Sequence, residues 1–257
     1  MKTLRMIRVA WWLQLKMRSR SAFDGALTII WPLFFASTAF LMQRAGRNQA
    51  DILAATAVGA SVMGVWSAMS TTAAGLLQSE RRQGTLELLV ASPMPFAVVM
   101  APTTLAMATI GAYSMISTLV WARVLFGIHV HVGSPVLLLI AAPVTVLSVG
   151  MLGFLLSVTA VRYRTAWALG NATEYPVWLI CGFLVPLSVL PGWVHPLAWL
   201  LAPTWGVEAL RGAALGGPVA IDVAVCLLLG LFYAVLGALL SRTLLDSARR
   251  NATLALS

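Results

Sequence analysis

Six stretches of this 257-residue chain contain no charged side chain, and the shortest of them just fit a membrane span. They are 25–43, 52–79, 88–122, 131–161, 175–207 and 223–241. A charged group at the bilayer centre costs about 3 kcal/mol, and a spanning helix needs about 20 residues. Only 10% of the residues are charged, where a soluble domain has about 25%. The sequence therefore predicts an all-α integral membrane protein.

Helix breakers divide the longest stretches, so these stretches hold more than a regular span. Pro93 and Pro95 lie near the start of the third stretch, and Pro191 with Gly192 lies inside the fifth. Proline lacks the amide donor that a helix interior needs. We therefore predict six transmembrane helices, at 25–42, 53–77, 97–123, 136–160, 173–190 and 221–241.

The basic residues are distributed unevenly between the two sides of these spans. With the N-terminus inside, 13 of the 17 lysines and arginines fall on the inner side, which leaves Arg44, Arg47, Arg123 and Arg211 outside. Positive charge favours the cytoplasmic side, so the pattern predicts cytoplasmic termini. The formal charge of +9 then reflects topology and attraction to anionic lipid, and it requires no nucleic-acid partner.

Residues 1–23 precede the first span and have a pattern of their own. Leu4, Ile7, Trp11 and Leu15 share one helical stripe, while Lys2, Arg5, Lys16 and Arg20 lie away from it. Basic amphipathic helices that carry tryptophan lie in the membrane interface. We expect an interfacial helix on the inner leaflet; the alternative is a basic tail that only sets topology.

The reactive residues argue against an intramembrane enzyme. The histidines at 129, 131 and 195 lack the glutamate spacing of a zinc protease, and the residues after Ser61 lack the second glycine of a hydrolase elbow. Neither Lys2 nor Lys16 follows the glycines of a P-loop, so we expect no ATP site on this chain. No catalytic, cofactor or metal site is predicted.

Ionisable residues bear on whether an ion gradient could drive transport. Near the ends of the predicted helices lie Asp24, Asp51, Arg123, Glu174 and Asp222. We interpret them as boundary residues, and Glu174 can pair with Arg162 or Arg164. An ion-coupled carrier usually has such groups at mid-membrane. A six-helix secondary carrier is therefore the alternative rather than the preferred function.

The inner loop within 78–96 has a helical pattern of its own. Gly84 breaks the extension of the second span, Thr85 can cap a new helix, and Glu87 lies in its first turn, where the helix dipole favours an anion. Ser92 and Pro93 end it. The pattern predicts a short helix at the inner surface that suits a groove of another protein; the alternative is an ordinary connector.

The outer segment 191–217 contains regularly spaced breakers and tryptophans. Pro191, Pro196 and Pro203 forbid one continuous helix. Tryptophans recur every six residues, a type that favours the membrane interface. We expect short half-helices that enter from the outer face. Glu208 and Arg211 lie one helical turn apart and can pair.

Two motifs at these places resemble those of the ABC type-2 exporter permeases, which include daunorubicin-resistance, polysaccharide and lipo-oligosaccharide export permeases. The inner motif is Glu80-Arg81-Arg82-Gln83-Gly84-Thr85-Leu86-Glu87-Leu88-Leu89, followed by Ser92-Pro93. The outer motif is Leu190-Pro191-Gly192-Trp193, followed by Pro203-Thr204-Trp205 and then Ala209-Leu210-Arg211. With the six spans and the interfacial helix, the resemblance covers essentially the whole chain.

The resemblance implies one permease domain over 1–257 that pairs with a second permease chain, identical or paralogous. Two copies of a separate P-loop subunit would bind ATP and Mg. Its coupling residues would be Glu80, Arg81, Arg82, Gly84, Thr85, Leu86, Glu87, Leu88, Ser92 and Pro93. The outer gate would include Pro191, Trp193, Pro203, Thr204, Trp205, Glu208 and Arg211. The chain would export an amphiphilic drug, lipid or glycolipid across a bacterial plasma membrane, with 242–257 as a cytoplasmic tail.

Small residues in the second span suggest where two permease chains would meet. Helix association in lipid relies on close packing, which small side chains allow. We expect Gly59, Ala60 and Gly64, with Trp31 of the first span, to line this seam.

Overall fold

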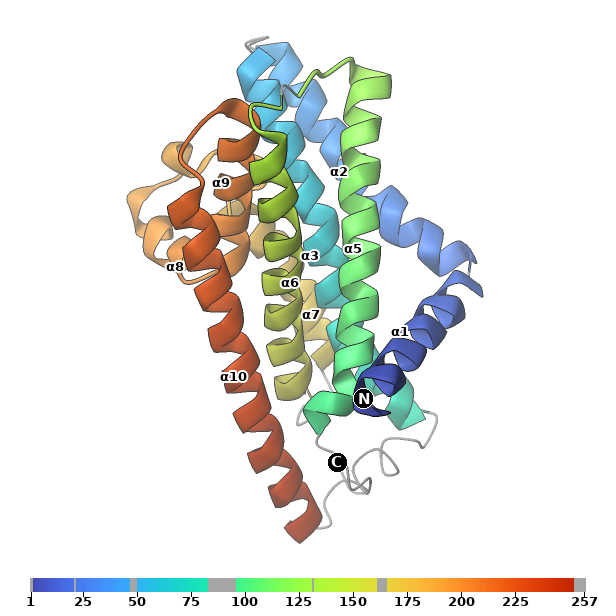
Figure 1. Cartoon of the computed structure of the whole chain (residues 1–257). Helices are drawn as coiled ribbons and strands as arrows, with labels where there is room; N and C mark the ends of the chain where they lie inside the picture. The colour runs from blue at the N-terminus through green and yellow to red at the C-terminus, as the bar shows by residue number, and fades with distance from the viewer. Residues whose placement is uncertain are drawn as a thin grey trace.

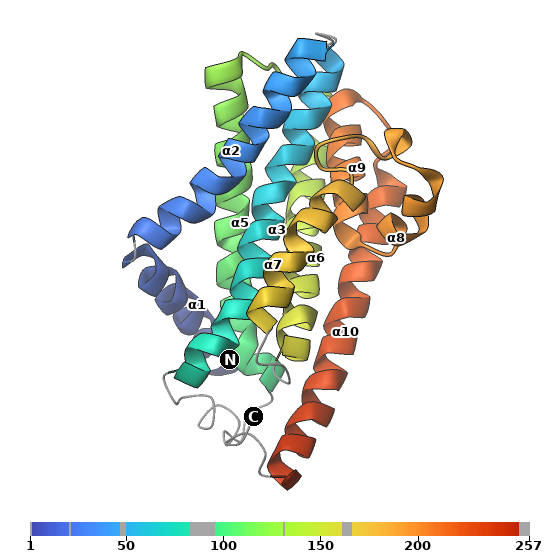
Figure 2. The same cartoon turned by 180° about the vertical axis from the view of Figure 1, so that it is seen from behind.

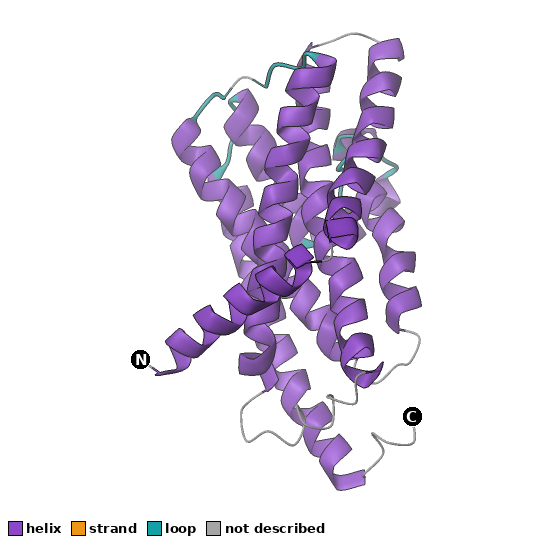
Figure 3. Cartoon of the chain, turned by 90° about the vertical axis from the view of Figure 1, so that its right-hand side faces the viewer, coloured by secondary structure: helices purple, strands orange, loops and turns teal. Residues whose placement is uncertain are grey.

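The computed structural model describes residues 2–20, 22–46, 50–82, 96–130, 132–160 and 166–251. Within these ranges the chain is helical and forms no strand. The long helices are α1 (Lys2–Arg20), α2 (Ala22–Gly46), α3 (Ala50–Arg82), α5 (Phe96–Phe126), α6 (Pro135–Ala160) and α10 (Ala220–Asn251). They run along one bundle axis, except for α1, which crosses the side of the bundle (Figure 1, Figure 3). The predicted all-α class is confirmed.

Helix α3 is the centre of the bundle. It packs against α2, α5, α6, α7 (Ala166–Ile180) and α9 (Ala202–Leu215). Every residue from Thr56 to Ser70 is buried, and many of these residues are small. Small side chains let the neighbouring helices approach closely, which explains how one helix can contact five others.

Three further helices are long and apolar enough to cross a membrane, besides α3 with Asp51–Ser70. They are α5 with Pro102–Phe126, α6 with Pro135–Thr159 and α10 with Ala220–Thr243. Pro102 and Pro143 lie inside α5 and α6, where neighbouring helices can satisfy the freed carbonyls. Large apolar side chains of α10, such as Leu228 and Phe232, are exposed, as expected of a lipid-facing surface. Among the described residues, four of the six predicted spans therefore meet this criterion.

The fifth predicted span, 173–190, differs most from the structure. Helix α7 begins at Ala166 and ends at Ile180, and the chain then turns at Gly182, whose φ is 72°. A left-handed residue ends a helix, and Pro186 prevents the helix from continuing. The predicted span is therefore too long at its C-terminal end, and α7 as described has 15 residues.

Helix α2 joins the bundle through aromatic and hydroxyl contacts. The ring of Phe35 lies 5.0 Å from that of Trp178 and 5.9 Å from that of Tyr175, which connects α2 to α7. Trp121 of α5 donates a hydrogen bond of 2.9 Å to Ser37. Side chains of α2 before Ile30 lie outside the described residues. These contacts place α2 beside α5 and α7.

Helix α1 forms as predicted and packs mainly on α5. Trp11 Nε1 donates a hydrogen bond of 3.1 Å to Thr109 Oγ1, which fixes α1 across the side of α5 (Figure 3). The end of α3, the start of α5 and the end of α10 lie at this same end of the bundle (Figure 1). This end is the one that the charge pattern assigns to the cytoplasm.

Candidate functional site

The outer segment is a series of short helices, each preceded or opened by a proline. After α7 come the 3₁₀ helices η1 (Leu187–Val189) and η2 (Gly192–Val194), then α8 (His195–Trp199) and α9. Pro186 and Pro191 are the N-caps of η1 and η2, and Pro196 and Pro203 lie in the first turns of α8 and α9. Proline fits a first turn because the amide there has no partner within the helix. The prediction that no continuous helix forms here is confirmed.

These short helices lie against the half of the bundle opposite α1, beside α10 (Figure 2). Thr204 Oγ1 donates to the carbonyl of Ala198 at 2.7 Å, and Trp205 Nε1 donates to that of Trp199 at 2.9 Å. The Tyr233 hydroxyl of α10 donates to the carbonyl of Leu200 at 2.6 Å. Side chains thus satisfy carbonyls at the turn between α8 and α9, and they hold the segment to α10.

Arg211 is the central residue of this segment. It lies on α9, and only 6% of its surface is exposed. Its Nε donates to the carbonyl of Ala55 at 3.1 Å, and its Nη2 donates to those of Gly182 at 2.7 Å and Phe183 at 3.3 Å. The planar guanidinium has five N–H donors in a rigid fork, so it can bond to several acceptors at once. One side chain therefore connects α9, α3 and the turn after α7.

The predicted ion pair between Glu208 and Arg211 is confirmed. Arg211 Nη1 lies 2.9 Å from Glu208 Oε1, and the Glu208 side chain is 39% exposed. Arg211 thus has one partly exposed carboxylate and three backbone carbonyls as partners. A buried charge needs such compensation, because desolvation is costly. The arrangement suits a structural pin rather than a catalytic group.

Glycines make the close contacts around this pin possible. A Cβ at Gly59 would overlap with the carbonyl oxygen of Phe183 and lie 2.6 Å from Arg211 Nη2. A Cβ at Gly206 would lie 2.5 Å from Thr145 Cγ2 of α6. Both positions therefore require the smallest residue, since the neighbouring atoms leave no room for a methyl group.

These contacts correct the predicted seam between two permease chains. Gly59, Ala60 and Gly64 are buried within this chain, and Gly64 faces Ser114 of α5. The small residues of α3 pack against helices of the same chain, so a second chain cannot reach them in this structure. The side chain of Trp31 lies outside the described residues.

Glu174 is a second buried ionisable residue, and the prediction for it was wrong. It lies in the middle of α7 with 6% of its surface exposed, and not at a helix boundary. Ser67 Oγ of α3 donates to its Oε1 at 2.6 Å. The proposed partners Arg162 and Arg164 lie outside the described residues. By contrast, Asp51 and Asp222 occupy first turns, and Arg123 occupies a last turn, as expected for boundary residues.

The predicted coupling segment lies mostly outside the described residues. Glu80, Arg81 and Arg82 form the last turn of α3, but their side chains are not described. The remaining predicted coupling residues fall in 83–95, which the structure does not describe: Gly84, Thr85, Leu86, Glu87, Leu88, Ser92 and Pro93. The short helix expected there stays a prediction.

The outer residues predicted from sequence do not form one cluster. Pro203 and Thr204 are buried with Arg211 on α9, and Trp205 is half-buried beside them. Trp193 is 72% exposed on η2, and Pro191 is exposed as well. The partners of Arg211 at Ala55, Gly182 and Phe183 were not predicted. Gly182 and Pro186 lie inside the predicted span 173–190, and these two helix breakers were the sequence signal for the turn after α7.

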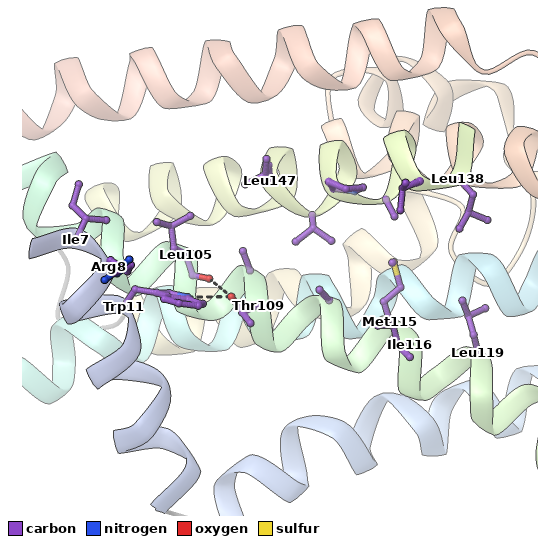
Figure 4. A pocket seen from close by; sticks show the side chains of 16 residues that line it. Ile7, Arg8, Trp11, Leu105, Thr109, Met115, Ile116, Leu119, Leu138 and Leu147 are labelled. Atoms are coloured by element: carbon purple, nitrogen blue, oxygen red, sulfur yellow. Dashed lines mark hydrogen bonds between the residues drawn. The ribbon is translucent and has the colours of Figure 1, made fainter. Parts of the chain in front are cut away.

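A groove lies on another side of the bundle, between α5 and α6. It encloses about 860 Å³, and its lining is apolar except for Arg8 and Thr109 among the described residues. Helix α1 closes one end through Ile7, Arg8 and Trp11 (Figure 4). The groove is separate from the Arg211 pin, because the two share no residue.

Comparison with known proteins gives one family. The family model described as ABC-2 type transporter matches residues 3–215, from α1 through α9. No curated protein matches the chain.

Proposed function

The chain belongs to the ABC-2 type transporter family as a multi-pass membrane permease, and we propose that it exports an amphiphilic drug, lipid or glycolipid. In this proposal it spans a bacterial plasma membrane six times, with both termini in the cytoplasm. ATP and Mg bind to two copies of a separate P-loop subunit, and this chain carries no cofactor of its own. A second permease chain, identical or paralogous, completes the transporter.

The length and position of α3 support coupling between the ATPase contact and the outer segment. This helix of 33 residues would span about 50 Å, at 1.5 Å per residue. Near its start, Ala55 accepts a hydrogen bond from Arg211, and at its end lie Glu80, Arg81 and Arg82. A rigid helix can transmit a displacement from one end to the other. We infer that movement of the ATPase at 80–93 reaches the outer segment through α3.

The apolar character of the chain supports the class of substrate. Large apolar side chains cover the exposed faces of α5, α6 and α10. Such faces offer few polar groups to a free glycan, whereas an amphiphile can pass along them while its polar part stays at the interface. An amphiphilic dye therefore serves as the test substrate.

Vesicle transport with a defined energy source tests this function. The chain is co-expressed with a separate P-loop ATPase subunit, and co-purification in detergent is measured first. Inside-out vesicles are then given an amphiphilic fluorescent dye. We expect ATP-dependent uptake that is lost when the P-loop lysine of the partner is replaced. Uptake driven by an ion gradient without any ATPase would contradict the proposal and support a secondary carrier.

A further inference from the structure

The groove between α5 and α6 is open to the surroundings of the bundle. Ala108, Ala112 and Ala142 form part of its lining, where small side chains leave the space unfilled. Along its edges, Ile116 is 59% exposed and Leu139 is 75% exposed. Figure 4 shows the apolar side chains of α5 and α6 on the two sides of this space. In a membrane, such a surface groove is in contact with lipid chains.

The length of the groove fits a lipid chain. Along α5 its lining runs from Leu105 to Leu119, which is about 21 Å of helix at 1.5 Å per residue. The hydrocarbon core of a bilayer is about 30 Å thick, so this length exceeds that of one leaflet. The groove can therefore accept an acyl chain that starts at the end near α1.

The end near α1 carries a positive charge. Arg8 belongs to the lining, and α1 contains no acidic residue but five further basic ones: Lys2, Arg5, Lys16, Arg18 and Arg20. No acidic residue lines the described groove. The hydrogen bond from Trp11 to Thr109 holds α1 over this end, so that Arg8 lies beside the apolar lining (Figure 4). An arginine beside an apolar channel is complementary to a phosphate attached to a hydrocarbon chain.

We propose that this groove binds an anionic phospholipid of the inner leaflet, with its phosphate at Arg8 and one acyl chain between α5 and α6. In this proposal the lipid is a resident of the permease and not the exported substrate, and its site shares no residue with the Arg211 pin. It would fasten α1 to α5 at the membrane interface. The assignment to the inner leaflet rests on the proposed topology, whereas binding itself requires neither ATP nor transport.

Photo-labelling of the purified full chain tests the site. A phosphatidylglycerol with a photoactivatable group in one acyl chain is added in detergent, and labelled residues are mapped by mass spectrometry. The same label on phosphatidylcholine reports the preference for a negative headgroup. We expect labelling at 105–119 and 138–147, with phosphatidylglycerol favoured about fivefold, the effect of one basic residue on an anionic lipid.

Two variants and two controls separate this site from general adhesion to lipid. Arg8→Gln should remove the preference for phosphatidylglycerol, and Ala112→Trp should fill the groove and abolish labelling of both lipids there. Arg5→Gln, on the same helix but outside the lining, should change neither result. Leu228→Trp, on the exposed face of α10, should leave labelling of the groove intact.

Several outcomes would overturn the lipid site. The first is an Arg8→Gln variant that still prefers phosphatidylglycerol, and the second is an Arg5→Gln variant that loses this preference to the same extent. The third is an Ala112→Trp variant whose groove is labelled as in the wild type. Absence of labelling at 105–119 and 138–147 in the wild-type chain would overturn it as well. Any of these results would leave the permease function standing, since transport is measured separately.

Discussion

Arg211 Nη2 lies 2.7 Å from the carbonyl oxygen of Gly182, and this hydrogen bond joins two residues that are 29 positions apart. Gly182 has a φ of 72°, in the left-handed region that glycine adopts without strain. The turn that ends α7 thus presents its carbonyl to a buried guanidinium on α9. This relationship determines where the outer segment begins and how it is held to the bundle.

Replacement of Arg211 should loosen the outer segment. Arg211→Met leaves the carbonyls of Ala55, Gly182 and Phe183 without this donor, and buried unsatisfied acceptors cost about 1–3 kcal/mol each. We expect a free energy of unfolding lower by about 3 kcal/mol or more, measured by thermal unfolding in detergent. Glu208→Gln is the control and should cost about 1 kcal/mol or less, because this pair is partly exposed. Equal effects of the two variants would contradict the role of Arg211.

A methyl group at Gly59 tests the close contact between α3 and the turn after α7. Gly59→Ala places a Cβ against the Phe183 carbonyl and Arg211, so the backbone must move. Overpacking of this kind costs about 1–3 kcal/mol. Gly192→Ala is the matched control, since no atom lies within 4 Å of a Cβ there. Equal thermal stability of the two variants would show that α3 and the turn are not in contact.

Much of the helical framework could be predicted because lipid imposes strict requirements on sequence. The absence of charge predicted the four helices that are long and apolar enough to cross a membrane among the described residues, and Pro191, Pro196 and Pro203 predicted the breaks in the outer segment. The same reasoning failed at Glu174, because it assigned this charge to a helix boundary, and it gave Arg211 only Glu208 as a partner. Both are buried, with partners from distant parts of the chain that local patterns do not reveal.

The contact between Ser67 and Glu174 should contribute to the packing of α7 on α3. Ser67→Ala removes the hydroxyl that donates to the buried carboxyl group, and we expect a loss of about 1–3 kcal/mol in the free energy of unfolding. Glu174→Gln keeps an oxygen acceptor, so it should lower the free energy of unfolding by less than Glu174→Ala does. Thermal unfolding in detergent measures the stability of these three variants. If Glu174→Ala is as stable as the wild type, the contact contributes nothing.

Burial within the outer segment predicts which substituted cysteines react. Ala198 and Val207 are fully buried, whereas Gly192 and Ala220 are exposed. We expect Ala198→Cys and Val207→Cys to react slowly with a membrane-impermeant thiol reagent, and Gly192→Cys and Ala220→Cys to react rapidly. The chain's own Cys181 and Cys226 are buried, so the unmodified protein serves as the blank. Uniformly rapid labelling from 198 to 210 would rule out a re-entrant segment.

The segment after α3 should transmit the action of the ATPase. Arg82→Glu reverses the charge at the end of α3, and Leu86→Asp places a charge in the apolar part of the motif. A mispaired charge in an interface costs about 2–5 kcal/mol, so we expect ATP-dependent transport to fall by at least about tenfold. Membrane insertion should be unchanged, since Arg82 lies outside the candidate span of α3 and Leu86 lies outside the spans predicted from sequence.

Arg242→Glu is the control for this last experiment, because Arg242 is an exposed basic residue near the same end of the bundle, on α10. It should keep both ATPase binding and transport, since α10 is outside the proposed coupling segment. Co-purification measures binding, and uptake of the amphiphilic dye into inside-out vesicles measures transport. Full binding and transport by Arg82→Glu and Leu86→Asp would place the ATPase contact elsewhere. A loss of the same size in Arg242→Glu would show that inner positive charge in general, rather than the segment after α3, supports the association.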